Sequence, residues 1–164
     1  MITQQELIEL YSYDPETGSF YHGKNRQRAK EGVRTGTKTN LGYILIRVKG
    51  KTQKAHRLAW LYVYGEWPSL GIDHINGDPS DNRIVNLRLA NQSQNIANAK
   101  VFKTNKFGIK GVTIRKDTNR WTARITVNYK SVSLGCFDSF DEAKNAYQKA
   151  SKQYFGDFAS DGIR

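Results

Sequence analysis

Apolar and polar residues alternate in three short stretches between residues 112 and 134, the clearest pattern along the chain. A period of two is typical of strands that bury one face. The DTNR and NYK segments between the stretches favour turns, so we expect an antiparallel meander. Apolar residues then recur at three- and four-residue steps from Phe140 to Tyr154, behind a capping Ser139. The pattern predicts a three-stranded antiparallel sheet backed by one helix.

Shorter elements are predicted before residue 100. Capping boxes at Thr3 and Asn91 indicate where two helices begin. The segment 42–50 alternates like a strand with one dry face, and 55–64 carries a helical apolar stripe that Gly65 ends. The remaining predicted elements are strands at 71–75 and near 84–89. We therefore expect an α+β fold with a domain over 1–99, a linker over 100–109 and a second domain over 110–164.

Positive charge is concentrated in two blocks. The 164 residues carry a net charge of +11, and residues 21–60 contain eleven Lys and Arg against one Glu. Residues 101–130 contain eight against one Asp. A solvated surface is one explanation, but basic stretches interleaved with Tyr, Trp and Thr favour a polyanion held through its phosphates. A structural RNA-binding protein would also explain this charge.

Cysteine content and hydropathy exclude several classes of protein. Cys136 is the single cysteine, which excludes an internal disulfide and a thiolate zinc site. No apolar run approaches the length of a membrane span, and MITQQELIEL lacks the features of a secretory signal. We therefore expect a soluble, intracellular and cytoplasmic protein with no membrane partner.

The stretch GIDHINGDPSDNRIVNL, residues 71–87, carries the candidate chemistry. Asp73 and His74 stand where a strand meets a turn-rich loop. Asp73 and Asn95, on the following helix, could each offer one oxygen to a hard divalent ion such as Mg²⁺. A neutral His74 can take a proton from water, and Asn86 could accept its other ring N–H. Turns also favour Asn and Asp for structural reasons alone, which explains most other polar residues of the loop.

These residues closely resemble the core of HNH homing endonucleases. The resemblance rests on DHINGDPSDNRIVNLR, on the later QSQN and on the preceding AHRLAW, with the spacing D-H-x11-N-x8-N. It implies a ββα-metal (His-Me finger) nuclease core in which His74 activates water and Asn86 supports the loop and the His. It also implies that Asp73 and Asn95 bind the ion. Because many members have a second His where Asn95 stands, the chain resembles the H-N-N subgroup, and the implied ion is Mg²⁺ or Mn²⁺.

The resemblance implies hydrolysis of one phosphodiester in double-stranded DNA by a single-metal, His general-base mechanism. The leading interpretation is a site-directed endonuclease of the free-standing homing type, acting in a bacterial or phage-infected cell. No protein partner is predicted, and a monomer is compatible with the sequence. The alternative is a sequence-specific DNA-binding regulator with a vestigial nuclease core.

The C-terminal segment carries a second resemblance. KGVTIRK, NRWTARI, VSLGCFDSFDEAKNAY and YFGDFA resemble the plant ethylene-response-factor (Apetala2) DNA-binding domain over residues 108–159. That resemblance implies a sheet that reads the major groove, whereas a hydrated outer sheet face is the alternative. The positions that fall where that family touches DNA are Lys110, Thr113, Arg115, Arg124, Thr126, Ser131 and Ser133.

A basic block from Lys24 to Arg57 is expected to hold the DNA backbone. His56 has two interpretations, a phosphate contact or a buttress of the active site. The predicted backbone-contact residues of this block are Arg26, Arg28, Arg47, Lys54, His56 and Arg57.

Overall fold

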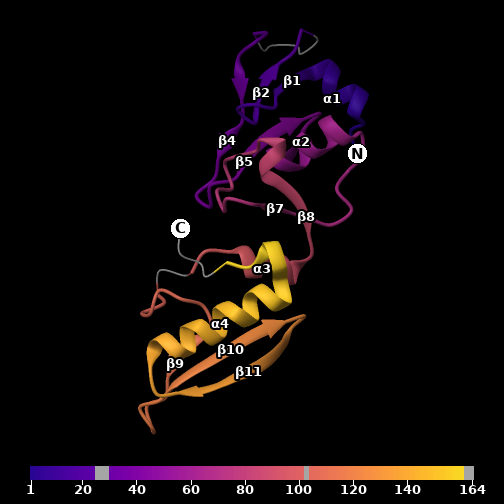
Figure 1. The fold of residues 1–164 in the computed structure, drawn as a ribbon. Helices are drawn as coiled ribbons and strands as arrows, with labels where there is room; N and C mark the ends of the chain where they lie inside the picture. Colours follow the sequence, from indigo (N-terminus) through magenta and orange to yellow (C-terminus); the bar gives the residue numbers. More distant parts are fainter. Residues whose placement is uncertain (25–29, 102–103, 161–164) are drawn as a thin grey trace. The chain divides into compact units, whose positions relative to one another are not determined.

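Two compact units make up the chain, one formed by Met1–Leu89 and the other beginning at Ala90 (Figure 1). The computed structural model describes residues 1–24, 30–101 and 104–160. Arg26 and Arg28, two of the predicted backbone contacts, lie outside the described residues. The division between the units falls earlier in the chain than the linker predicted at 100–109.

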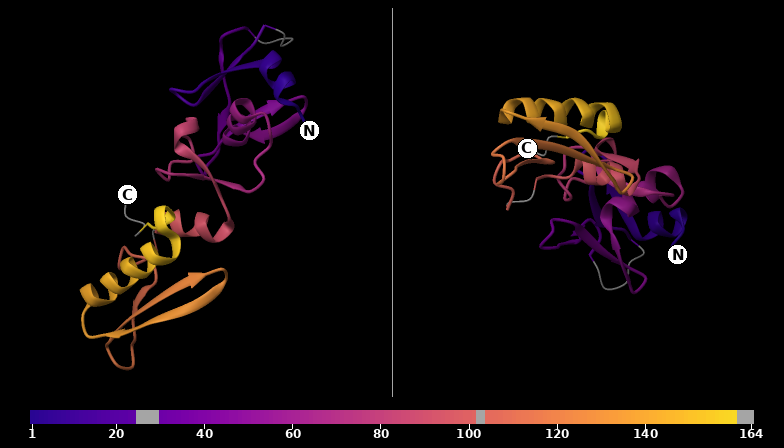
Figure 2. Two further views of the ribbon diagram at one scale, coloured as in Figure 1. Left: turned by 45° about the vertical axis from the view of Figure 1, so that its right-hand side comes forward. Right: turned by 90° about the horizontal axis from the view of Figure 1, so that it is seen from below.

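Short sheets form most of the first unit. Its strands make three-stranded sheets in the orders β1-β2-β3 and β4-β5-β6, both antiparallel, and a two-stranded sheet of β7 and β8 (Figures 1 and 2). The elements are α1 (Gln4–Leu10), β1 (Tyr11–Asp14), β2 (Ser19–His22), β3 (Arg34–Thr35), β4 (Thr37–Lys38), β5 (Ile44–Val48), β6 (Lys51–Lys54), α2 (Ala55–Tyr64), β7 (Gly71–His74), the 3₁₀ turn η1 (Ile84–Asn86) and β8 (Leu87–Ala90).

Local sequence explains the ends of the two helices in this unit. The Thr3 hydroxyl accepts the Glu6 N–H at 3.3 Å, and Glu6 Oε2 accepts the Thr3 N–H at 3.0 Å. This capping box satisfies two backbone donors at the start of α1. Helix α2 ends at Gly65, whose φ of 80° is the left-handed conformation that glycine adopts without strain. Both predicted helix signals are confirmed.

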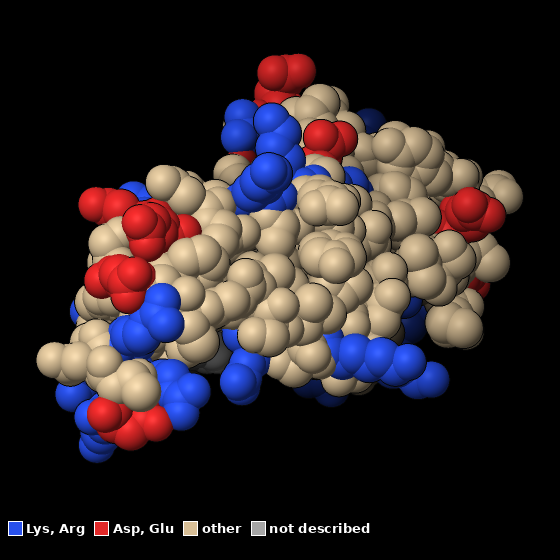
Figure 3. Space-filling model, turned by 60° about the horizontal axis from the view of Figure 1, so that its bottom comes forward, with Lys and Arg blue, Asp and Glu red and all other residues tan. Residues whose placement is uncertain are grey.

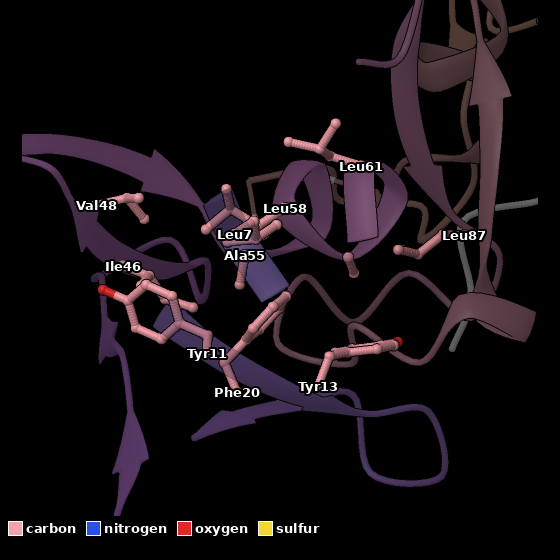
Figure 4. Close-up of a cluster of buried hydrophobic side chains, with 11 residues drawn as sticks. Leu7, Tyr11, Tyr13, Phe20, Ile46, Val48, Ala55, Leu58, Leu61 and Leu87 are labelled. Carbon is pink, nitrogen blue, oxygen red and sulfur yellow. The ribbon is translucent and has the colours of Figure 1, made fainter. Parts of the chain in front are cut away.

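The core of the first unit gathers side chains from both helices and from several strands (Figure 4). Ile46 and Val48 are buried, whereas Arg47 between them is exposed, which confirms the predicted one-sided strand. The side chains labelled in Figure 4 are Leu7, Tyr11, Tyr13, Phe20, Ile46, Val48, Ala55, Leu58, Leu61 and Leu87.

The β1–β2 hairpin packs against the loop that follows β7. The Tyr13 hydroxyl donates a buried hydrogen bond to Asn82 O at 2.8 Å. Gly18, with a φ of 68°, approaches the same loop so closely that a Cβ there would lie 2.3 Å from Arg83 N and 2.5 Å from Asn82 C. The hairpin therefore fixes the position of the Asn82 backbone.

The second unit contains a three-stranded antiparallel sheet, in the order β11-β10-β9, that is covered by α4 (Figures 1 and 2). Val112, Ala123 and Ile125 are buried with Ala143 and Tyr147 of α4. The predicted meander and its helix are thus confirmed. The elements are α3 (Gln92–Asn98), β9 (Val112–Ile114), β10 (Trp121–Val127), β11 (Lys130–Phe137), α4 (Phe140–Phe155) and the 3₁₀ turn η2 (Gly156–Phe158). In the described part of the chain, no helix combines the length and the apolar character needed to cross a membrane.

Two predicted features differ from the structure. The apolar run 84–89 begins with the η1 turn, in which Asn86 N–H donates to Arg83 O at 2.9 Å, and the strand itself starts only at Leu87. Phe107 and Ile109, placed in the predicted linker, pack in the core of the second unit. Short apolar runs have too little periodicity to separate these cases from sequence alone.

Gly18→Ala should destabilise the first unit more than Gly50→Ala. Both positions have a positive φ, which costs an L-residue about 1–2 kcal/mol, and a Cβ at Gly50 meets nothing within 4 Å. At Gly18 the added methyl group also clashes with loop backbone, which costs a further 1–3 kcal/mol or so. Urea unfolding of both variants measures the difference, and equal losses of stability would contradict the described packing.

Candidate active site

Asp73 and His74 form the end of β7, and backbone hydrogen bonds close the loop after them. Gly77 N–H donates to His74 O at 2.8 Å, and Ile75 N–H donates to Asn86 O at 2.9 Å. Asp73 is 5% exposed and His74 is 6% exposed. Both members of this adjacent pair are therefore held inside the unit, where electrostatic interactions are stronger than in water.

The Asn86 amide ties the two ends of the loop together. Its Oδ1 accepts the Asn76 N–H at 3.0 Å, and its Nδ2 donates to Asn76 Oδ1 at 3.1 Å and to Asp81 O at 2.9 Å. These bonds give Asn86 the loop-supporting position that the sequence suggested. They also direct its amide at the loop rather than at the His74 ring, where we had expected it.

Asn82 provides the side-chain oxygen next to His74. The distance from His74 Nε2 to Asn82 Oδ1 is 3.4 Å, and both residues are buried. The Asn82 amide donates through Nδ2 to Ser80 O at 3.1 Å, which turns its carbonyl oxygen toward the ring. A neutral imidazole that donates from Nε2 carries its lone pair on Nδ1. Sequence reasoning missed Asn82 because it looked like one more turn residue.

Two further rings pack around His74. The centroids of the His56 and His74 rings are 5.0 Å apart at an interplanar angle of 80°, and the Tyr43 ring lies 5.5 Å from His56 and 6.2 Å from His74. His56 is 6% exposed. This placement favours the buttress interpretation of His56 over a phosphate contact.

Burial keeps both imidazoles uncharged. Desolvation is the largest cause that lowers the pKa of His74, while the Asn82 contact and the charges of nearby carboxylates, Asp73 first, act in the opposite direction. Desolvation, followed by repulsion from His74 when that ring is protonated and from the charges of Lys54 and Arg57, lowers the pKa of His56 to about 3. His74 is therefore neutral near pH 7, as a general base must be.

Arg88, a residue that sequence reasoning missed, binds the Asp73 carboxylate. Its Nε donates to Asp73 Oδ2 at 2.8 Å, and its Nη2 lies 2.8 Å from the same oxygen. Arg88 lies on β8 and Asp73 on β7, so the ion pair links the two strands. A buried carboxylate paired in this way is fixed in orientation.

The chemistry of the donors fits a divalent cation held by few protein ligands. Among the described residues, no three His, Cys, Asp or Glu side chains gather closely enough to hold a metal ion. The predicted set consists instead of the Asp73 carboxylate and the Asn95 amide oxygen, which are hard ligands of the kind Mg²⁺ prefers. Asn95 lies on α3 in the second unit, where its Nδ2 is 3.5 Å from Ala90 O. Its role toward a metal stays a prediction.

The basic side chains predicted to hold the DNA backbone have varied surroundings. Figure 3 shows Lys and Arg side chains in several groups, some of them next to Asp and Glu side chains. Arg47 is exposed on β5. The Lys54 ammonium lies 4.4 Å from the centroid of the Tyr43 ring, and the Arg57 guanidinium lies 5.7 Å from that of Trp67. Lys54 and Arg57 therefore also pack on aromatic rings within the unit.

Five of the residues predicted to touch DNA lie on one exposed face of the C-terminal sheet. Arg124 pairs with Ser133 and Thr126 pairs with Ser131 across β10 and β11. These four residues and Thr113 on β9 are exposed. The face therefore presents hydroxyl and guanidinium donors opposite the face that α4 covers.

Two other predicted DNA contacts are engaged within the protein. Lys110 Nζ donates to Ala97 O at 2.6 Å and to Ile96 O at 3.2 Å. Arg115 donates from Nη2 to Asp117 Oδ2 at 2.6 Å and from Nε to Asp117 Oδ1 at 3.0 Å. Lys110 and Arg115 would have to break these hydrogen bonds to bind DNA. Both are therefore weaker candidates for DNA contact than Arg124.

Comparison with known proteins gives one family and two relatives. The HNH endonuclease family matches residues 53–97. Protein 3.8 of Escherichia phage T7 is 30% identical over 110 residues, which cover 66% of this chain and 90% of that protein. An uncharacterized HNH endonuclease of Acanthamoeba polyphaga mimivirus is 28% identical over 120 residues, covering 73% of this chain and 62% of that protein.

Acid should destabilise the protein through its buried histidines. The folded-state pKa of His56 is about 3, below the ordinary value of 6.5, so the unfolded chain takes up the proton first. Stability from this group is complete above pH 6.5 and is lost as the pH falls toward 3, with a slope of about 1.4 kcal/mol per pH unit. Unfolding free energies measured between pH 6.5 and 5 should fall less steeply in His56→Gln than in the wild type. Identical slopes would contradict the buried placement of His56.

Proposed function

We propose that this chain, whose residues 53–97 match the HNH endonuclease family, is a metal-dependent DNA endonuclease in which His74 is the general base. One observation carries the proposal: the buried His74 ring lies with Nε2 3.4 Å from Asn82 Oδ1 and with a lowered pKa. A neutral ring with one nitrogen engaged by a carbonyl has its lone pair on the other nitrogen, ready to accept a proton.

Proton transfer from water to His74 Nδ1 generates the hydroxide that attacks the phosphorus of a phosphodiester. The P–O3′ bond then breaks, which leaves a 5′-phosphate and a 3′-oxygen that takes a proton from solvent. The imidazolium formed by the proton transfer gains a stronger hydrogen bond to Asn82 Oδ1, because the donor is then charged. The carboxylates of Asp73, Asp78 and Asp81 also favour the charged ring. These interactions offset the cost of charging a buried group, while burial keeps the ring neutral before the reaction.

Asp73 and Asn95 would hold the ion, Mg²⁺ or Mn²⁺, in a ββα-metal motif made from β7, β8 and α3. When bound, such an ion supplies positive charge at the phosphate and at the leaving 3′-oxygen. Arg88 holds the Asp73 carboxylate through Oδ2 at 2.8 Å and so limits how that group can turn. A single-metal mechanism is proposed because the predicted protein ligands are one carboxylate and one amide.

The C-terminal sheet is the proposed reader of the DNA sequence, in the manner of an Apetala2-like domain. Support comes from its exposed face, where Arg124, Thr126, Ser131 and Ser133 form two neighbouring cross-strand pairs. An Arg can bond guanine in the major groove, and hydroxyl groups can contact bases or phosphates. A reader of this kind would make the enzyme a site-directed, homing-type endonuclease, and the phage relative supports a role in infected cells.

His74→Ala should lower kcat for DNA cleavage by about 10²–10⁴-fold, the usual contribution of a general base. Affinity for the same DNA without metal should stay unchanged, because a buried ring contributes little to phosphate binding. End-labelled DNA cleavage and gel-shift titration measure the two quantities. His22→Ala, which removes an imidazole from β2, is the matched control and should cleave like the wild type.

Equal cleavage by His74→Ala would remove this residue from the mechanism. Tight, site-specific binding by a wild-type protein that cleaves no DNA with either Mg²⁺ or Mn²⁺ would instead favour the DNA-binding regulator with a vestigial nuclease core.

Arg124→Ala should relax site selection, because each lost base contact costs about 1–3 kcal/mol of discrimination. Arg115→Ala should have a smaller effect, since Arg115 is paired with Asp117 at 2.6 Å. Cleavage-site mapping on genomic DNA compares the two variants. A uniform loss of binding to all sequences in Arg124→Ala would identify it as a phosphate contact and not a reader of bases.

A further inference from the structure

The first turn of α3 is bonded to the tip of the β10–β11 hairpin. The Tyr129 hydroxyl donates to Gln92 Oε1 at 2.7 Å, and the Asn128 N–H donates to Ser93 Oγ at 3.2 Å. The hairpin tip and α3 belong to the same compact unit and lie side by side (Figures 1 and 2). Residues more than thirty positions later in the chain therefore hold the start of the helix.

The conformation of this hairpin tip suits Asn128 but is unfavourable for Tyr129. Val127 pairs with Lys130, so Asn128 and Tyr129 form a two-residue loop, and their φ values are 48° and 65°. Such loops favour Asn followed by Gly, and a bulky residue at positive φ is an outlier. Strained positions of this kind point to a role for the side chain that occupies them. Here the Tyr129 side chain is the one that reaches α3.

The last turn of α3 is held by Lys110. Its ammonium donates to Ala97 O at 2.6 Å and to Ile96 O at 3.2 Å, which satisfies carbonyl groups at the negative end of the helix. Helix α4 and the η2 turn pack along the side of α3. Since α3 has only seven residues, it would be marginally stable without these contacts.

We propose that Tyr129 and Lys110 are positioning residues for Asn95. In this proposal the C-terminal sheet supports α3, the helix that carries Asn95, as well as reading DNA. The inference rests on the proposed function, in which Asn95 gives an oxygen to the ion. Both positioning residues lie outside the stretch that matches the nuclease family, residues 53–97.

Tyr129→Phe and Tyr129→Gly test the proposal together. The first removes only the hydroxyl group, whereas the second also relieves the positive φ, so its melting temperature should equal or exceed that of the wild type. Both should speed amide hydrogen exchange at Asn95 and Ala99 by about three- to tenfold, as expected for one lost hydrogen bond. Both should also raise the Mg²⁺ concentration for half-maximal cleavage, with DNA affinity in the absence of metal unchanged.

Asn119→Gly is the matched control, because it relieves a φ of 57° in the β9–β10 connection and removes no bond to α3. It should leave exchange in α3 and the Mg²⁺ dependence as in the wild type. Wild-type exchange and wild-type Mg²⁺ dependence in Tyr129→Phe would overturn the proposal. If the wild type cleaves no DNA, the proposed function fails, and with it the positioning role. Faster amide exchange in the two Tyr129 variants would still show that the Tyr129 hydrogen bond stabilises α3.

Discussion

The contact between Asn82 and His74 is the interaction on which the candidate site depends. In the proposed mechanism the Asn82 carbonyl oxygen favours a proton on His74 Nε2, which leaves Nδ1 to act as the base. The contact depends on the position of Asn82. That position is fixed by the hydrogen bond from Asn82 Nδ2 to Ser80 O and by the hydrogen bond from the Tyr13 hydroxyl to Asn82 O. The hairpin near the start of the chain thus helps to position the residue that contacts His74. This coupling gives the hairpin a role beyond its contribution to the core.

Electrostatics in the site are balanced between two opposing requirements. The proposed general base must be neutral before the reaction, and desolvation lowers the pKa of His74 in that direction. The same ring must accept a proton during the reaction, which the surrounding carboxylates and the Asn82 carbonyl make easier. Asp73 contributes to this balance while its carboxylate is held by Arg88. His56 fills the space beside the ring without adding a charge of its own, because its pKa is far below neutral pH.

Patterns that act over a few residues could be predicted from the sequence. The capping boxes at Thr3 and Asn91 and the alternation along β10 are local, and the structure contains the helices and the strand that they predict. The choice of Asn82 over Asn86 as the neighbour of His74 could not be predicted, because it depends on how the loop folds and on a distant hairpin. The Arg88 ion pair depends on the pairing of β7 with β8, and the bonds of Tyr129 and Lys110 to α3 depend on tertiary structure.

The account can be tested most directly by determining the protonation state of His74 in the folded protein. Long-range ¹H–¹⁵N correlation spectra of the histidine rings near pH 7, with assignment from Asn82 and His74 variants, report which nitrogen carries a proton. We expect a neutral His74 ring with its proton on Nε2 and no proton on Nδ1, as a bond donated to Asn82 Oδ1 implies. A proton on Nδ1 alone, or on both nitrogens, would contradict the proposed general base.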